Sequence, residues 1–171
     1  MEVEELMTAE WPKRKTIRGR GILAVACKLG ALDFATGERL DVGTITTRHY
    51  HHLYPDALLD GFNIKSYLAL NCALIADKTN LTIGRKDPLE YIKDRYKWTS
   101  EGIVRERLQS HLIPIEELAN GGYEGLSGDA QYTKLKEDYD AFIRKRAEYI
   151  LKAVIILAEG RQLSPAEIYG E

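Results

Sequence analysis

One long amphipathic stretch near the C-terminal end constrains the fold most strongly. Between Ala130 and Gly160 the apolar residues recur at intervals of three and four, as they do along one face of an α-helix. We therefore predict a single long helix that ends at Gly160. Arg146 interrupts this apolar stripe, and we expect it to reach solvent along its aliphatic stem or to pair with a buried acid, rather than to reach the functional site. The stripe consists of Tyr139, Phe142, Ile143, Tyr149, Ile150, Ala153, Val154 and Leu157.

The rest of the chain predicts helices on both sides of a small β-containing middle, which is an α+β fold. An apolar pattern between Ile17 and Leu29 indicates a first helix, with Gly30 as its C-terminal cap. Proline at position 88 favours a helix start there. The other predicted elements are a hairpin over 32–44, a β segment over 45–54, a loop from 55, a strand over 71–76, a helix start at 77–80, and helices over 88–96, 101–109 and 114–119, followed by a glycine-rich connector over 121–128.

Composition excludes several classes of protein. The chain has 171 residues, 44% of them hydrophobic and 29% charged, so it is long enough for one domain with a true core. A net charge of -2 argues against a binder that depends on bulk positive charge. Apolar runs are too short to span a bilayer, and four glutamates within residues 1–10 are unlike a signal or transit peptide. Cys27 and Cys72 stand apart, without a CxxC pair for zinc, so we expect free thiols in a cytoplasmic, reducing compartment.

The middle of the chain carries the residues that suggest chemistry. Three of the four histidines lie between His49 and His52, and the latter is followed by Asn71 and Asn80 at distances of 19 and 28 residues. Taken singly, a histidine is more often a hydrogen-bonded core residue, and asparagines commonly serve in turns and caps. Adjacent histidines at a strand end, followed by a strand, a turn and a helix start, form a more specific combination.

This combination resembles the HNH, or ββα-metal, nuclease motif in its His-Asn-Asn form. The wider chain resembles the C-terminal HNH domain of GmrSD-like modification-dependent restriction proteins, over residues 11–160. The nine-residue gap between the asparagines is also similar to that in the HNH domain of CRISPR effector nucleases. Supporting segments are HHLYPDALL, ALIADKTNLTIGRKDPLEYI, QSHLIPIEEL and YDAFIRKRAEYILKAVIILAEG.

The resemblance implies a role for each residue of the motif. His52 matches the general base that removes a proton from water, and Asn71 matches the asparagine that orients this base. Asn80 and His51 match the ligands of a divalent metal, Mg²⁺ or Mn²⁺, although His51 stands where many relatives have aspartate. His49, two residues earlier, is a rival ligand. Two neutral ligands would bind Mg²⁺ weakly and favour softer ions such as Mn²⁺.

Basic residues around the motif are expected to contact phosphates of DNA. These are Arg48, Lys78, Arg85 and Lys86, for each of which a solvated basic face is the alternative interpretation. His111 is shared with the restriction family, and we expect it to pack or cap between helices rather than to act in catalysis.

The sequence thus predicts a metal-dependent DNA endonuclease of a restriction or antiviral defence system that nicks double-stranded DNA. By resemblance, a ParB-like NTPase sensor domain or subunit would precede it, since the chain itself contains no GxxxxGK[ST] phosphate-binding loop. Alternatives are a non-catalytic DNA-binding module on the same fold, an RNA-cleaving toxin-like nuclease, or a purely structural helical protein. Expected domain limits are a linker or N-terminal extension at 1–12, the nuclease domain at 13–160 with its ββα core at 32–97 and helical flanks at 13–30 and 101–160, and a C-terminal tail at 161–171.

Overall fold

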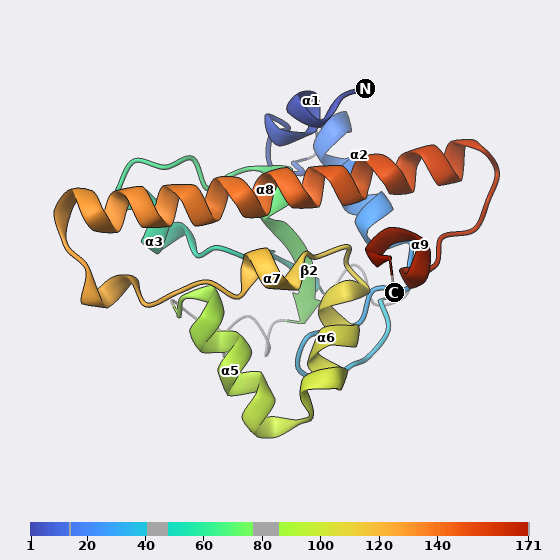
Figure 1. Cartoon of the computed structure of the whole chain (residues 1–171). Coiled ribbons are helices and arrows are strands. Elements are labelled where there is room, and N and C mark those ends of the chain that lie inside the picture. The colour runs from blue at the N-terminus through green and yellow to red at the C-terminus, as the bar shows by residue number, and fades with distance from the viewer. Residues whose placement is uncertain (14, 41–47, 77–85, 171) are drawn as a thin grey trace.

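The long helix predicted near the C-terminal end is present in the structure. A computed structural model describes residues 1–13, 15–40, 48–76 and 86–170. Helix α8 (Gly128–Ala158) crosses the whole molecule in the view of Figure 1, and the helices near the N-terminus and α9 pack against it. Gly160 follows with a φ of 74°, a left-handed conformation that suits glycine and ends the helix as predicted. The buried face of α8 consists of Leu135, Tyr139, Phe142, Ile143, Arg146, Ala147, Ile150, Ala153 and Ile156.

The N-terminal segment is part of the packed domain. Helix α1 (Val3–Met7) lies against α8, and its Leu6 is only 1% exposed. Trp11 is 7% exposed, so this part of residues 1–12, which the sequence predicted as a linker or N-terminal extension, packs against the domain. Helix α2 (Ile17–Ala26) ends earlier than predicted, because residues 27–30 form tight turns in place of a further helical turn.

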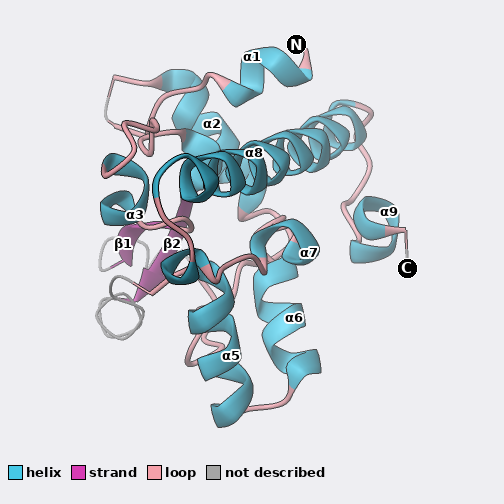
Figure 2. Ribbon diagram, turned by 60° about the vertical axis from the view of Figure 1, so that its left-hand side comes forward, coloured by secondary structure: helices cyan, strands magenta, loops and turns pink. Residues whose placement is uncertain are grey.

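A two-stranded antiparallel sheet lies beneath the long helix (Figure 2). Strand β1 (Arg48–His52) pairs with β2 (Cys72–Ala76) in a register that places His52 opposite Cys72 and Arg48 opposite Ala76. The predicted loop after Pro55 begins with a short helix, α3 (Asp56–Asp60), and the strands are joined through the 3-10 turn η2 (Ala69–Asn71). The two predicted β segments are therefore present and pair with each other.

In the described part of the predicted hairpin over 32–44, the chain forms a turn that the side chain of Asp33 stabilises. One isolated bridge joins Leu32 and Arg39, and the buried Asp33 accepts hydrogen bonds from the backbone nitrogens of Ala35 and Thr36, both at 3.0 Å. The second oxygen of Asp33 accepts from the nitrogen of Ala76, at 2.6 Å. This turn therefore fastens the end of β2 to the domain.

Side-chain caps explain where two of the following helices begin. Asp87 accepts from the nitrogen of Glu90 at the start of α5, and Ser100 accepts from that of Ile103 at the start of α6. Helix α6 has the predicted limits. The elements are α5 (Pro88–Trp98), α6 (Glu101–Gln109), α7 (Ile115–Leu118), the 3-10 turn η3 (Tyr123–Gly125) and α9 (Pro165–Tyr169).

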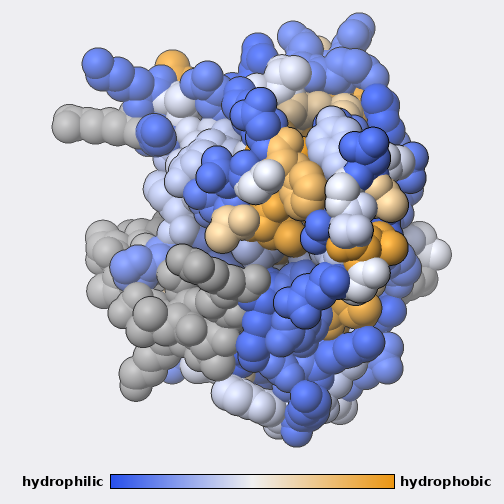
Figure 3. Space-filling model, turned by 90° about the vertical axis from the view of Figure 1, so that its left-hand side faces the viewer, coloured by the Kyte–Doolittle hydropathy of each residue, from blue (hydrophilic) through white to orange (hydrophobic). Residues whose placement is uncertain are grey.

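The C-terminal residues, predicted as a tail, also pack on the domain. Ile168 of α9 is 2% exposed, and the hydroxyl of Tyr169 donates to the carbonyl of Gln109 at 2.9 Å. None of the helices in the described part of the chain has the length and apolar character to cross a membrane. On the face shown in Figure 3, apolar side chains form a central patch surrounded by hydrophilic ones.

The fold class is α+β, mostly helical, as predicted. The two strands form the small antiparallel sheet of this fold. The helix start predicted at 77–80 lies outside the described residues, so the complete ββα arrangement stays a prediction.

Candidate functional site

The two adjacent histidines occupy opposite faces of strand β1, because successive side chains of a strand alternate. His51 lies opposite Ala73, which belongs to the main core, and its side chain is 4% exposed. Its ring centre lies 6.4 Å from that of Tyr91. His52 lies opposite Cys72, which belongs to a smaller apolar cluster with Trp11, Leu23 and Leu74. The side chains of the proposed metal ligand, His51, and the proposed base, His52, therefore lie on opposite faces of strand β1.

His52 is held between two aromatic rings. The indole of Trp11 stacks on the imidazole with ring centres 4.1 Å apart and an angle of 23°, and the ring of Tyr67 meets it edge-on at 4.8 Å. Its Nε2 is buried and has no hydrogen-bond partner among the described residues. Burial lowers the pKa of His52, and the nearby charge of Asp56 opposes this shift. These contacts favour a neutral imidazole with a fixed orientation.

Asn71 is fully buried and fastens the chain that follows His52. Its Oδ1 accepts from the nitrogen of Tyr54 at 2.8 Å, and its Nδ2 donates to the carbonyls of Tyr54 and Ser66, both at 3.0 Å. The carbonyl of Asn71 accepts from the nitrogen of Leu53 at 2.9 Å. Through these bonds the side chain fixes the loop on which the proposed base depends.

The remaining predicted site residues are only partly available. Asn80, Lys78 and Arg85 lie outside the described residues, and so does the side chain of Arg48, whose backbone begins β1. Lys86 forms an ion pair with Asp94, which offsets its charge. His49 is exposed on β1. Within the described part of the chain no three His, Cys, Asp or Glu side chains gather into a metal site.

Arg146 binds the main chain on both sides of Asn71. It is fully buried on α8, and in place of the expected solvent or acid it donates to four backbone carbonyls, so both expectations were wrong. Two of these carbonyls, of Leu70 and Cys72 at 2.7 and 2.9 Å, flank Asn71; the others belong to His111 and Leu112, at 3.1 and 3.3 Å. Burial lowers the pKa of Arg146 to about 10, which leaves it charged at neutral pH.

His111 is fully buried, as the packing role expected of it requires. Its Nε2 donates to the carbonyl of Leu32 at 2.8 Å, and its ring meets that of Phe34 edge-on at 4.9 Å. Burial lowers the pKa of His111 to about 4, so the ring is neutral near pH 7.

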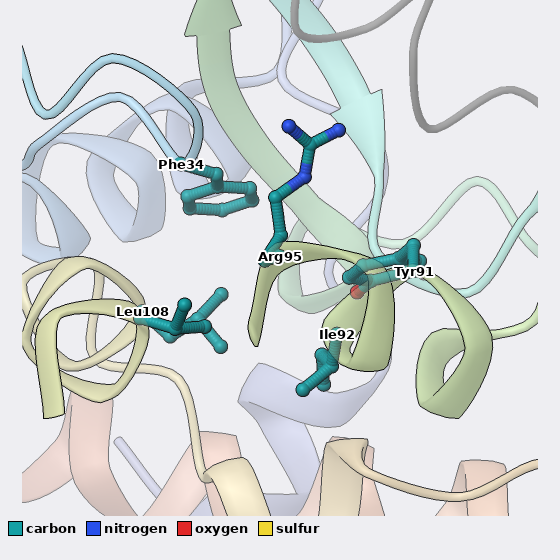
Figure 4. Close-up of a pocket in the computed structure, with 6 residues that line it drawn as sticks. Phe34, Tyr91, Ile92, Arg95 and Leu108 are labelled. Carbon is teal, nitrogen blue, oxygen red and sulfur yellow. The ribbon is translucent and has the colours of Figure 1, made fainter. Parts of the chain in front are cut away.

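A second buried cation, Arg95, lies on the other side of the sheet. Figure 4 shows its guanidinium pointing toward the two strands, past Phe34 and Tyr91. It is 5% exposed, and its Nε and Nη1 have no hydrogen-bond partner among the described residues. The hollow that it lines has a volume of about 10 Å³, enough for one water molecule and too small for a substrate.

Sequence reasoning did not identify Trp11, Tyr67 or Asp33 as neighbours of the site. Trp11 begins the basic segment and Tyr67 lies in the loop before β2, and nothing in their local sequence indicates that both contact His52. A useful signal was the burial expected of a tryptophan, since large aromatic side chains generally pack against other residues.

Comparison with known proteins gives limited information. No family model matches the chain, and no solved structure matches it. An uncharacterised protein of Methanocaldococcus jannaschii is 31% identical over 121 aligned residues, which cover 63% of this chain and 20% of that protein. The chain therefore spans about a fifth of the length of this relative. The resemblance to HNH nucleases stays a prediction.

Proposed function

We propose that the chain is a metal-dependent endonuclease domain of the HNH type that hydrolyses phosphodiester bonds in DNA. The observation that carries the proposal is the arrangement of His52 and Asn71. An imidazole lies at the end of β1, fixed between two aromatic rings, and the buried asparagine binds the loop that follows it.

The proposed chemistry is a hydrolysis with His52 as general base. Its imidazole accepts a proton from water while the water oxygen forms a bond to phosphorus, and one phosphorus–oxygen ester bond breaks. The released oxygen takes a proton from solvent. Asn71 acts as a positioning residue, because its bonds to Tyr54 and Ser66 hold the backbone after His52.

A divalent ion, Mg²⁺ or Mn²⁺, would supply charge stabilisation at the phosphate and the leaving oxygen. We propose His51 and Asn80 as its ligands, with His49 as the rival to His51. The donor set of an imidazole and an amide suits Mn²⁺ at least as well as Mg²⁺. Cleavage at one such centre cuts one strand, so the expected product is nicked duplex DNA.

The proposed setting follows from the same resemblance. A restriction or antiviral defence role, and a ParB-like NTPase sensor as domain or subunit, would explain how a nuclease of net charge -2 finds its DNA. Recognition would then reside in that partner, and this chain alone would nick at low salt with little sequence preference.

The test is incubation of supercoiled plasmid with purified protein and Mg²⁺, Mn²⁺ or EDTA. We expect nicked circles with either ion, at least as many with Mn²⁺, and intact plasmid in EDTA. Asn80→Ala should need more metal for the same rate, whereas His49→Ala should leave the metal dependence unchanged. Cutting that EDTA does not affect would refute the metal mechanism, and DNA binding without any cutting would favour the non-catalytic module.

A further inference from the structure

A groove opens beside His52 on the surface that the N-terminal segment builds. It has a volume of about 150 Å³ and is lined by Glu10, Trp11, Lys13, Lys65 and Tyr67. Trp11 and Tyr67 are the two residues whose rings enclose the imidazole of His52. A molecule in this groove would therefore lie next to the proposed base.

Hydrogen bonds to main-chain atoms fix the walls of the groove. The nitrogen of Trp11 donates to the carbonyl of Tyr67 at 3.1 Å, which joins the two sides. The hydroxyl of Tyr139 on α8 donates to the carbonyl of Lys65 at 3.1 Å, and Asn71 binds the carbonyl of the adjacent Ser66. A ligand would thus meet a preformed surface, which lowers the entropy cost of binding.

Two lysines of the groove have no carboxylate partner in the described part of the chain. Lys13 and Lys65 are exposed, and neither ammonium group forms an ion pair with a described residue. Lys86, the described lysine that the sequence predicted as a DNA contact, is instead paired with Asp94. Unpaired lysines release counterions when they meet phosphates, which is the main source of affinity for nucleic acids.

Exposed aromatic rings accompany these charges. Tyr67 is 47% exposed, with the ammonium of Lys13 5.9 Å from its ring centre. Tyr50, on the same strand face as His52, is 48% exposed and meets Trp11 edge-on at 6.3 Å. Alternating cations and aromatic faces are typical of surfaces that bind a nucleic-acid strand through phosphates and stacked bases.

We propose that this groove binds one strand of the DNA substrate beside the scissile phosphate, with phosphates at Lys13 and Lys65 and an unstacked base on Tyr67. This inference rests on the proposed function. It adds a binding site for one DNA strand, which the HNH motif by itself does not predict. The neighbouring hollow, lined by Asp56 and Asp60, shares Lys65 with this groove, so these carboxylates limit how close a phosphate can come on that side. Glu10 is the acidic residue in the groove and should oppose binding.

The test measures binding of labelled single-stranded and duplex DNA in EDTA, where cleavage does not interfere, at salt concentrations between about 50 and 200 mM. Lys13→Ala/Lys65→Ala should weaken binding and reduce the slope of log affinity against log salt by roughly 1 to 2. Lys145→Ala/Lys152→Ala removes the same charge from the far hollow beside α9 and should change neither quantity. Glu10→Gln should tighten binding.

The stacking contact is tested by a matched pair of variants. Tyr67→Ala should weaken single-stranded DNA binding about ten-fold, whereas Tyr67→Phe, which keeps the ring, should bind as the parent does. Unchanged binding in both the double-lysine variant and Tyr67→Ala would overturn the groove, even if the parent protein nicks plasmid. Conversely, lysine-dependent binding by a protein that never cuts would support the groove and refute the proposed function.

Discussion

Asn71 binds the main chain of Tyr54 through both ends of its amide: the oxygen accepts from the Tyr54 nitrogen at 2.8 Å, and the nitrogen donates to the Tyr54 carbonyl at 3.0 Å. Such a two-way bond fixes the peptide units on both sides of the Tyr54 Cα, because the nitrogen belongs to one of them and the carbonyl to the next. Leu53, between Tyr54 and His52, is held as well, because its nitrogen donates to the Asn71 carbonyl and its carbonyl accepts from the hydroxyl of Tyr91.

Asn71→Asp tests this relationship with little change in volume. The carboxylate keeps the acceptor for the Tyr54 nitrogen but turns a donor into a negative oxygen that faces the carbonyls of Tyr54 and Ser66. Because all of these groups are buried, we expect a loss of about 3 kcal/mol in the free energy of unfolding. Urea denaturation at pH 7 measures it. The exposed Gln162→Glu makes the same amide-to-carboxylate change at the surface and should lie within about 0.5 kcal/mol of the parent protein.

His52→Ala should reduce plasmid nicking by about 10² to 10⁴-fold, because loss of a general base removes proton transfer from the transition state. DNA affinity in EDTA should stay close to that of the parent protein, since a base contributes little to ground-state binding. The exposed His49→Ala on the same strand is the comparison. A purified His52→Ala protein that nicks at the parent rate would exclude His52 as the base.

Arg146→Met should be among the most destabilising substitutions in the chain. Methionine fills much of the space but leaves the four carbonyls that Arg146 binds without a donor. We expect a loss of about 3 to 5 kcal/mol in the free energy of unfolding, measured by chemical denaturation. Arg144→Met, two residues earlier, removes an exposed ion pair with Glu4 and should cost less than about 1 kcal/mol. Equal effects of the two variants would show that the carbonyl contacts are dispensable.

His111 should make the fold sensitive to mild acid. Its pKa is about 4 in the folded protein against 6.5 for the free side chain, so the unfolded chain binds the extra proton between these values. Stability is therefore full above pH 6.5 and falls as the pH drops toward 4, by on the order of 3 kcal/mol. Unfolding free energies at pH 7 and pH 4.5 measure the loss. It should be smaller in His111→Gln, which does not titrate, and unchanged in the exposed His49→Gln.

Local signals account for the elements that could be predicted. The limits of α6 and the start of α5 follow from side chains next to them, Ser100 and Asp87, which cap the helices. The register that pairs His52 with Cys72 agrees with the predicted order of strands. In each case the determining residues lie within a few positions of the element.

The contacts that could not be predicted join residues far apart in the chain. Trp11 reaches His52 across 41 positions, and the sequence does not show which aromatic residue will cover a given ring. Arg146 was expected to find water or an acid because the carbonyls left free by the turns at Leu70 and Leu112 become visible only in three dimensions. A buried cation can be satisfied by main-chain oxygens, which leave no trace in the composition.

The N-terminal segment is tied to the loop before β2 by the bridge between Glu10 and Leu68 and by the bond from the Ala69 nitrogen to the Ala9 carbonyl. These contacts limit where the chain can be truncated. A fragment that begins after residue 12 would lack Trp11, and one face of the His52 ring would then be uncovered.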